Sequence, residues 1–156
     1  MIDESSVSSN KITIHAPAQI VWDVIVDFEH YSLWNRFCPH ISGELKLGAA
    51  LTMQVDLGQG LQEQVERITR LEPGEIIVWS MENKPGDPVH ADRIQRIEAA
   101  DEESCTYVTV DEFSGEFAPT MLEHFGPLIE EGFNRCALGL KARAEALFKL
   151  QQAAGT

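Results

Sequence analysis

Apolar and polar residues alternate through the middle of the chain, between residues 40 and 114. In ALTMQVDLG (residues 50–58) the apolar side chains share one face and the polar ones the other: Leu51, Met53, Val55 and Leu57 against Thr52, Gln54 and Asp56. A period of two is typical of a β-strand with one buried face. Further strands are predicted at 41–48, 61–71, 76–81, 89–99 and 105–115. Because only short turns separate these segments, we predict a meander of five or six antiparallel strands.

Two of these strands show which residues share a face. The segment 61–71 is expected to return along 50–58 after a turn at GQG (58–60). Its alternation slips between Val65 and Ile68, which indicates a β-bulge. In the strand at 76–81, one side carries Ile77, Trp79 and Met81.

Helical periodicity replaces this alternation near both ends of the chain. A short strand at 11–15 precedes a helix predicted over 17–28, with Pro17 in its first turn, where the missing N–H costs nothing. The next segment, FEHYSLWNRF (28–37), has an aromatic residue at every third position and is predicted to be a short helix that ends before Pro39. Residues 128–150 carry one apolar stripe: Ile129, Phe133, Cys136, Leu140, Ala144 and Leu147. Since proline kinks a helix interior, this long helix is expected to start or bend near Pro127.

The order of these elements predicts an α+β fold. A sheet with one apolar face needs a cover, and only the C-terminal helix is large enough to supply it. We therefore predict a helix-grip fold, in which a curved antiparallel sheet wraps around the long C-terminal helix and two short helices follow the first strand. We expect a flexible leader at residues 1–9 and one domain at 10–152. The space between sheet and helix is expected to hold either side chains or a ligand.

Composition narrows the possible partners. The net charge of −13 disfavours nucleic acid and anionic lipid, since both are bound through basic patches. The three cysteines are far apart and form no metal-binding spacing, so we expect free thiols, no metal and no cofactor. No signal peptide is recognisable, and no apolar run reaches the ~18 residues of a membrane helix. We predict a cytoplasmic protein with no membrane insertion; the oligomeric state is left open.

Several sequence features together resemble the START-like or Bet v 1-like (SRPBCC) superfamily, in its polyketide cyclase/dehydrase-like group. The features are the order of elements, VWDVIVDF followed by Tyr31, Trp34, Asn35 and Phe37, the EFSG segment at 112–115, and the final helix containing ALGLKARAEAL. The resemblance covers residues 10–150. It implies a cavity under the long helix that binds a hydrophobic small molecule.

Most of the candidate ligand-binding residues are apolar. In the 28–37 segment, Phe28 and Tyr31 are expected in the core, whereas Trp34 and Phe37 fit the core and the cavity rim equally well. The sheet would contribute Met53, Val55, Trp79 and Met81, because adaptable methionines suit a surface that accepts varied apolar shapes. The early half of the long helix would contribute Met121, Phe125, Ile129 and Phe133. Its later half, with Leu140, is expected to be solid core.

Two polar residues are candidates inside the cavity. Glu63 has the parity of Leu61 and Val65, and a buried carboxylate there would have a raised pKa and serve as an acid or base. Because of the bulge, the alternation does not decide which face of the sheet Glu63 lies on, and the outer face is favoured. His90 fits either a polar anchor in the pocket or a residue at the end of a loop. No catalytic motif is recognisable, so catalytic residues remain unassigned.

Three functions follow as hypotheses. The first is binding of a small hydrophobic or aromatic molecule between sheet and helix. The second is a cyclase/dehydrase-type enzyme that uses the same pocket, which requires a buried ionisable group with a shifted pKa. The third is a co-chaperone-like protein-interaction module. The sequence leaves open whether the protein is an enzyme.

Overall fold

Residues 1–155, the part of the chain that the structure describes, form eight β-strands, two α-helices and one 3-10 helix in this computed structural model. The strands are β1 (Ser6–Ser8), β2 (Ile12–Ile14), β3 (His40–Ser42), β4 (Ala50–Asp56), β5 (Leu61–Glu72), β6 (Ile76–Met81), β7 (His90–Asp101) and β8 (Ser104–Ser114). The helices are α1 (Ala18–Val26), the 3-10 helix η1 (Phe28–Leu33) and α2 (Ala118–Ala154).

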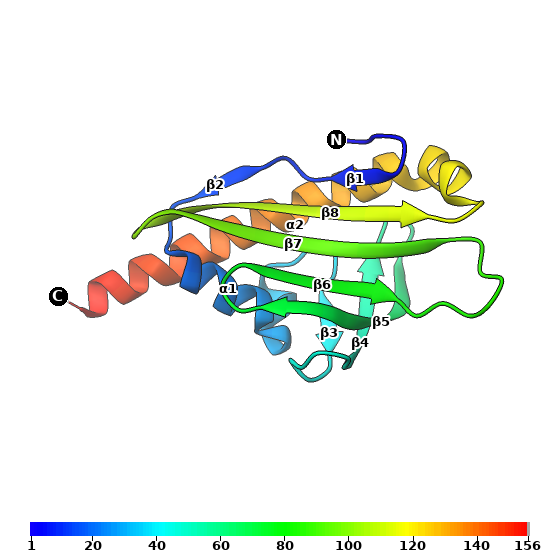
Figure 1. Ribbon diagram of the computed structural model, residues 1–156. Helices are drawn as coiled ribbons and strands as arrows, with labels where there is room; N and C mark the ends of the chain where they lie inside the picture. Colours follow the sequence, from blue (N-terminus) through cyan, green and yellow to red (C-terminus); the bar gives the residue numbers. More distant parts are fainter. Residues whose placement is uncertain (156) are drawn as a thin grey trace.

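All the strands belong to one antiparallel sheet with the order β1-β8-β7-β6-β5-β4-β3, and β2 also pairs with β8. Figure 1 looks onto the face of the sheet that is turned away from α2, and α2 crosses behind the strands. From β3 to β8 each strand pairs with its neighbour in sequence, which is the predicted meander. The α+β helix-grip fold predicted from the sequence is confirmed.

The N-terminal segment differs from the expected flexible leader. Ser6, Val7 and Ser8 form β1 and pair with β8 in the order Glu112, Asp111, Val110. Val7 has no exposed surface. A single valine was a weak sequence signal, but its burial and the backbone pairing hold this segment on the sheet.

Two element boundaries and the position of one irregularity also differ from the predictions. The strand expected at 41–48 is limited to β3, because bends and turns begin at Gly43. The irregular pairing in β5 lies between Ile68 and Arg70, rather than between Val65 and Ile68. Helix α2 begins at Ala118, nine residues before Pro127, and contains this proline.

The aromatic segment at 28–37 packs on α2 at two glycines. A methyl group at Gly132 would lie 2.2 Å from Cδ1 of Phe37, and one at Gly139 would lie 2.1 Å from the carbonyl oxygen of Trp34. Asn35 fixes the turn between these two aromatics, because its Oδ1 accepts hydrogen bonds from the backbone N–H groups of Phe37 and Cys38 at 3.0 and 2.8 Å. The segment therefore needs glycine on the helix to approach closely enough to close the end of the fold.

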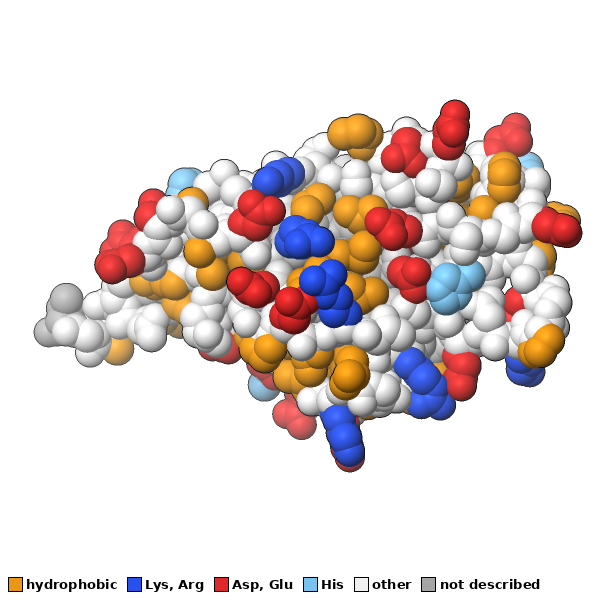
Figure 2. Space-filling model, in the orientation of Figure 1, with side chains coloured by type: hydrophobic (Ala, Val, Ile, Leu, Met, Phe, Trp, Pro, Cys, Tyr) orange, Lys and Arg blue, Asp and Glu red, His pale blue; other side chains and the backbone are white. Residues whose placement is uncertain are grey.

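The sheet face turned away from α2 carries charged side chains around apolar ones (Figure 2). Figure 2 shows acidic and basic side chains spread over it, with apolar atoms between them. None of the helices within residues 1–155 is long and apolar enough to cross a membrane.

The later half of α2 provides a test of the core. Leu140 is fully buried, whereas Leu138, on the same helix, is 60% exposed. We predict that Leu140→Ala lowers the free energy of unfolding by about 2–5 kcal/mol, the usual range for truncating a buried leucine. Leu138→Ala is the matched control and should change it by less than about 0.5 kcal/mol. Urea denaturation of both variants measures the difference, and equal effects would contradict this assignment of the core.

Candidate functional site

A cavity of about 530 Å³ lies between the sheet and the first turns of α2. Strands β4 to β8 and Phe37 line its walls, and Met121, Phe125 and Ile129 of α2 close one side. Most of the lining side chains are apolar. The volume falls in the range of about 300–1,000 Å³ that is usual for small-molecule sites.

Strand β5 contributes polar residues to this cavity because of its register. Val55 lies opposite Gln62, and Met53 lies opposite Gln64. Directly opposed residues of an antiparallel pair point to the same face. Gln62, Gln64 and Glu66 therefore share the cavity face with the apolar residues of β4, and all three line the cavity.

Arg93 on β7 is the most unusual group in the cavity wall. It is 5% exposed, and it lies opposite Trp79 of β6 and Asp111 of β8 in the sheet. Its guanidinium carbon lies 4.5, 5.2 and 5.7 Å from the ring centroids of Phe133, Phe37 and Trp79. These cation–π contacts stabilise the buried charge.

Few protein acceptors satisfy the Arg93 guanidinium. Its Nε donates to Thr109 Oγ1 at 3.0 Å, and Nη2 donates to Cys136 Sγ at 3.6 Å. No carboxylate of the described residues lies within the 4.0 Å of an ion pair with it. The indole N–H of Trp79 is also buried without a partner in this part of the chain. A guanidinium has five N–H donors, so the wall retains donor capacity for an oxygen of a ligand.

Two carboxyl groups accompany Arg93. Burial, followed by the negative charge of Asp111, raises the pKa of Glu66 to about 8 against the lowering effect of Arg93. Burial likewise raises the pKa of Asp111 to about 7 against the lowering effect of Arg93. At neutral pH, Glu66 is therefore largely protonated and Asp111 is about half ionised. The cavity thus holds a permanent cation, a proton donor and a proton acceptor.

Eight of the twelve residues proposed from the sequence line this cavity. They are Phe37, Met53, Val55, Trp79, Met81, Met121, Phe125 and Ile129. They come from the 28–37 segment, β4, β6 and the early half of α2, so the structure brings these distant segments together. Whether they contact a ligand remains a proposal.

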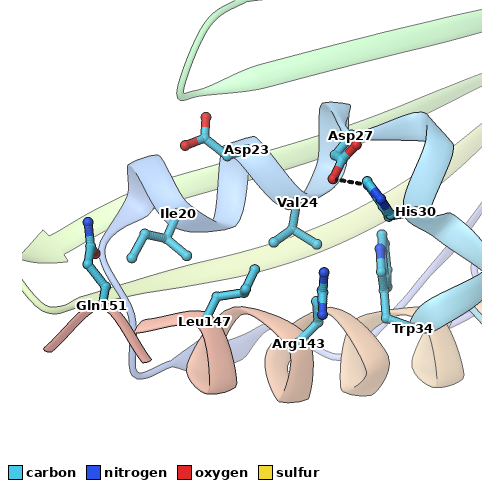
Figure 3. A pocket seen from close by; sticks show the side chains of 9 residues that line it. All are labelled: Ile20, Asp23, Val24, Asp27, His30, Trp34, Arg143, Leu147 and Gln151. Atoms are coloured by element: carbon cyan, nitrogen blue, oxygen red, sulfur yellow. Dashed lines mark hydrogen bonds and ion pairs between the residues drawn. The ribbon is translucent and has the colours of Figure 1, made fainter. Parts of the chain in front are cut away.

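Trp34 lies elsewhere. It is 5% exposed and lines a separate hollow between α1 and the C-terminal half of α2, together with Val24, Arg143 and Leu147. Figure 3 shows Trp34 beside Arg143 and His30, on the side of η1 that faces these helices. Since its carbonyl packs on Gly139 of α2, this position belongs to the closure of the fold and not to the cavity rim.

The other three proposed residues also do not line the cavity. Glu63 lies opposite Gln54 and within 3.4 Å of its side-chain amide, on the outer face of the sheet. His90 is on the outer face as well, with its Nε2 2.9 Å from Asp92 Oδ1. Phe133 is fully buried behind the cavity, where its ring contacts the ring of Phe37 and the guanidinium of Arg93.

Sequence reasoning missed Glu66, Arg93 and Asp111. Charged residues are rarely buried, so none of the three was proposed as a cavity residue. The length of the β4–β5 turn was a usable signal. If Asp56 pairs with Leu61 across the turn, then Val55, Met53 and Leu51 pair with Gln62, Gln64 and Glu66. These three polar residues therefore share a face with the apolar residues of β4.

The described residues contain no group of three or more His, Cys, Asp or Glu side chains that could hold a metal ion. Cys38, Cys105 and Cys136 are buried and unpaired.

Comparison with known proteins gives one family match and related sequences. Residues 6–145 match the model of the family described as polyketide cyclase/dehydrase and lipid transport. Over 127 residues the chain is 27% identical to the oxopyrrolidines biosynthesis cluster protein O of Penicillium oxalicum. That alignment covers 62% of this chain and 63% of the relative, so the two proteins match over less than two thirds of their lengths.

Solved structures share the fold. The Zhui aromatase/cyclase from Streptomyces sp. R1128 superposes with a TM-score of 0.70 and 21% identity, over 90% of this chain and 93% of that one. A START superfamily protein from Mycobacterium smegmatis gives a TM-score of 0.73 and 17% identity, over 92% and 99% of the two chains. At these identities the likeness establishes the fold.

The raised pKa of Glu66 predicts how stability depends on pH. The folded protein holds this proton up to about pH 8, whereas in the unfolded chain the glutamate has its ordinary pKa of 4.5. The stabilising contribution is therefore complete below pH 4.5 and is lost as the pH rises through 8. We predict that the free energy of unfolding falls by about 2–4 kcal/mol between pH 5 and pH 8.5.

Denaturation at a series of pH values measures this effect. Glu66→Gln should make the decline clearly smaller, leaving the part that is due to Asp111. Glu63→Gln, on the outer face of the same strand, should leave the slope of the wild type unchanged. Parallel curves for all three proteins would contradict a buried carboxyl group at position 66.

Proposed function

Because the chain belongs to the polyketide cyclase/dehydrase and lipid transport family, we propose that it binds a small, largely apolar or aromatic molecule that carries oxygen groups. The observation that supports this best is the 530 Å³ cavity with apolar walls, lined by the buried Glu66 and Arg93 and by Asp111. Apolar walls supply affinity, and a few placed polar groups fix the orientation of a ligand.

The polar groups indicate how the ligand would lie. Arg93 and the Trp79 indole have N–H groups without protein acceptors, so they favour a carbonyl or phenolic oxygen. Glu66 and Asp111 favour a hydroxyl group, which can donate to a carboxylate or accept from a carboxylic acid. A ligand with two oxygens spaced along an apolar or aromatic skeleton satisfies both sets.

A second proposal is that the bound molecule undergoes acid–base chemistry of the cyclase/dehydrase type. The specific support is that two carboxyl groups in one cavity have pKa values of about 7 and about 8, close to neutral pH. General acids and bases work best when their pKa lies near the working pH. The oxopyrrolidine cluster protein and the aromatase/cyclase are similar to this chain, which is consistent with such a role.

A proton-transfer sequence can be written for these residues. The carboxylate of Asp111 takes a proton from the carbon next to a ketone, and Arg93 stabilises the enolate oxygen that results. The enolate carbon then forms a bond to a second carbonyl carbon. Glu66, still protonated, gives its proton to the new alkoxide, which becomes a hydroxyl group. Loss of water from this product repeats the pattern: one carboxylate removes a C–H proton and one carboxylic acid protonates the leaving hydroxyl.

Ligand binding is tested by a thermal-shift screen with aromatic and polyketide-like compounds, paired with native mass spectrometry. A compound at 100 times its dissociation constant should stabilise the protein by ~2.7 kcal/mol. Ala91 lines the cavity, so Ala91→Leu should reduce this stabilisation by filling the site. Ala100→Leu, on an exposed position of the same strand, is the control and should bind as the wild type does. Binding that is unaffected by Ala91→Leu would place the ligand elsewhere.

Catalysis is tested with a bound compound that the protein converts. Glu66→Gln and Asp111→Asn keep the shape of each side chain but remove proton transfer, so each should lower kcat by about 10²–10⁴-fold. The affinity for the compound should change much less. Glu112→Gln, on the outer face of β8 beside Asp111, serves as the control and should retain full turnover. Unchanged kcat in both cavity variants would contradict the assignment of Glu66 and Asp111 as the acid and the base.

A further inference from the structure

The loop between β6 and β7, residues 82–89, connects the rim of the cavity to the start of α2. Its two end residues, Glu82 and Val89, line the cavity. The carbonyl of Pro88 accepts a hydrogen bond of 3.0 Å from the N–H of Phe117, directly before α2. Gly115 allows this approach, because a methyl group there would lie 2.3 Å from the Pro88 oxygen and its φ is +104°. Movement of this loop would therefore change the opening between sheet and helix.

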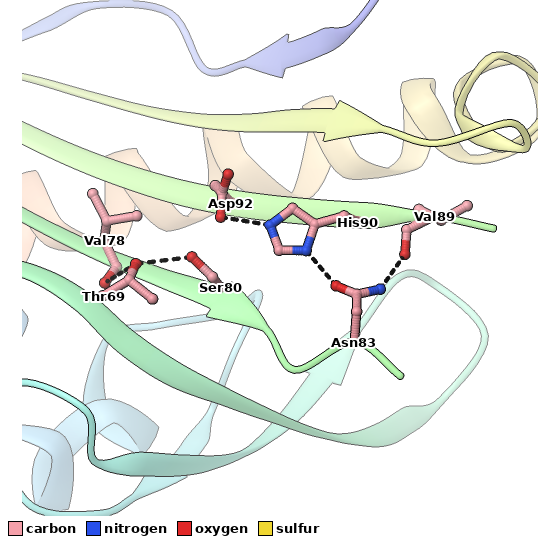
Figure 4. A network of polar contacts seen from close by, with 7 residues as sticks. All are labelled: Thr69, Val78, Ser80, Asn83, Val89, His90 and Asp92. Atoms are coloured by element: carbon pink, nitrogen blue, oxygen red, sulfur yellow. Dashed lines mark hydrogen bonds and ion pairs between the residues drawn. The ribbon is translucent and has the colours of Figure 1, made fainter. Parts of the chain in front are cut away.

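One asparagine organises the loop. The side-chain nitrogen of Asn83 donates to the carbonyl of Val89 at 2.7 Å, and it lies 3.4 Å from Asp87 Oδ2. Both neighbours are acceptors, so they fix the orientation of the amide group. The side-chain oxygen of Asn83 consequently faces Nδ1 of His90, as Figure 4 shows.

His90 then has acceptors at both ring nitrogens. Nδ1 contacts the oxygen of Asn83, and Nε2 lies 2.9 Å from Oδ1 of Asp92. A neutral imidazole has one N–H and one lone pair, so it satisfies only one of these oxygens and places a lone pair against the other. Only the doubly protonated ring donates to both.

We infer that His90 is a pH-sensitive latch: in its cationic form it holds the 82–89 loop closed at the rim of the cavity, and loss of one proton releases the loop. Histidine side chains change charge between about pH 5 and pH 8, which gives the pH range of the switch. The latch acts at the outer face of the sheet, apart from the acid–base groups inside the cavity. It does not depend on which molecule the cavity binds.

The charged groups around His90 come from its own strand, from β8 and β5, and from the loop. Asp92 on its own strand contacts the ring, and Glu112 of β8 lies opposite Asp92 in the sheet. Asp87 in the loop accepts from the backbone N–H of Lys84 and faces Asn83. Arg70 of β5 lines the same outer hollow as His90, and its guanidinium is paired with Glu72. The surroundings of His90 thus hold the carboxylates of Asp92, Glu112 and Asp87, the Arg70–Glu72 ion pair and Lys84.

Amide hydrogen exchange in the loop tests the latch. We expect the protection of residues 83–89, corrected for the intrinsic effect of pH, to fall roughly tenfold from pH 5.5 to pH 8, as expected for the loss of a charged hydrogen bond. His90→Gln, which cannot change charge, should show no such pH dependence. Asn83→Ala should show low protection at both pH values. His40→Gln, on the far edge of the sheet, is the matched control and should behave as the wild type.

Two further readouts complete the test. ¹⁵N NMR of the histidine rings should show two protonated nitrogens for His90 at pH 5.5 and one at pH 8. The methyl group of Met121, near the rim, should become more accessible to a neutral paramagnetic probe at pH 8 in the wild type but not in His90→Gln, whereas Met53 should not change. A neutral ring at pH 5.5, the same pH response in wild type and His90→Gln, or an unchanged Met121 would each overturn the inference. Because none of these measurements needs a ligand, failure of the latch and failure of the proposed function are distinguishable.

Discussion

The buried guanidinium of Arg93 is the interaction on which the rest of the site depends. It lies between rings from three parts of the fold: Phe37 from the closing segment, Trp79 from the sheet and Phe133 from α2. A buried cation is costly without compensation, and here aromatic faces and two hydrogen bonds supply part of it. The same contacts leave Arg93 facing the cavity with unused donors. In a core without a cavity, these N–H donors would have no ligand to bind.

The polar residues of the cavity lie on strands that also contribute apolar residues to the core. On β5 the polar residues point inward up to Glu66, and from Ile68 onward the inward position becomes apolar. On α2, Ile129 lines the cavity, while the fully buried Phe133 and Leu140 lie further along the helix. The fold is therefore divided along its length into a packed end, closed by the 28–37 segment, and an open end with ionisable groups. This division places Glu66 and Asp111 where burial shifts their pKa values without disrupting the core.

The fold could be predicted from the sequence to a large extent, because strand alternation, the helical stripe and the turn residues all agree. Strand pairing and the role of α2 followed from these patterns, whereas β1 did not, since three residues carry little periodic signal. The apolar part of the cavity could also be predicted: parity and spacing place Met53, Val55, Trp79, Met81 and the early residues of α2 on inward faces, and the family resemblance implies a cavity there. Their contact with a ligand remains to be tested.

The polar part of the site could not be predicted from the sequence, and the reason is physical. Parity arguments assume that apolar residues point inward, and a functional cavity breaks this rule at the positions that matter for chemistry. Glu63 and His90 were the polar candidates, with the outer face favoured for Glu63, and both lie on the outer face. The turn register of β4 and β5 would have identified Glu66 instead. Arg93 and Asp111 follow only from the assembled sheet, because each needs the neighbouring strands to place it.

Direct titration of the side-chain carboxyl groups tests the central claim, that burial beside Arg93 tunes two acids to neutral pH. Carboxyl ¹³C NMR across pH 3 to 10, with Glu66→Gln and Asp111→Asn used for assignment, reports each group without a substrate. We predict a pKa of about 8 for Glu66 and about 7 for Asp111. Titration of both groups near pH 4, as for exposed carboxyl groups, would contradict it.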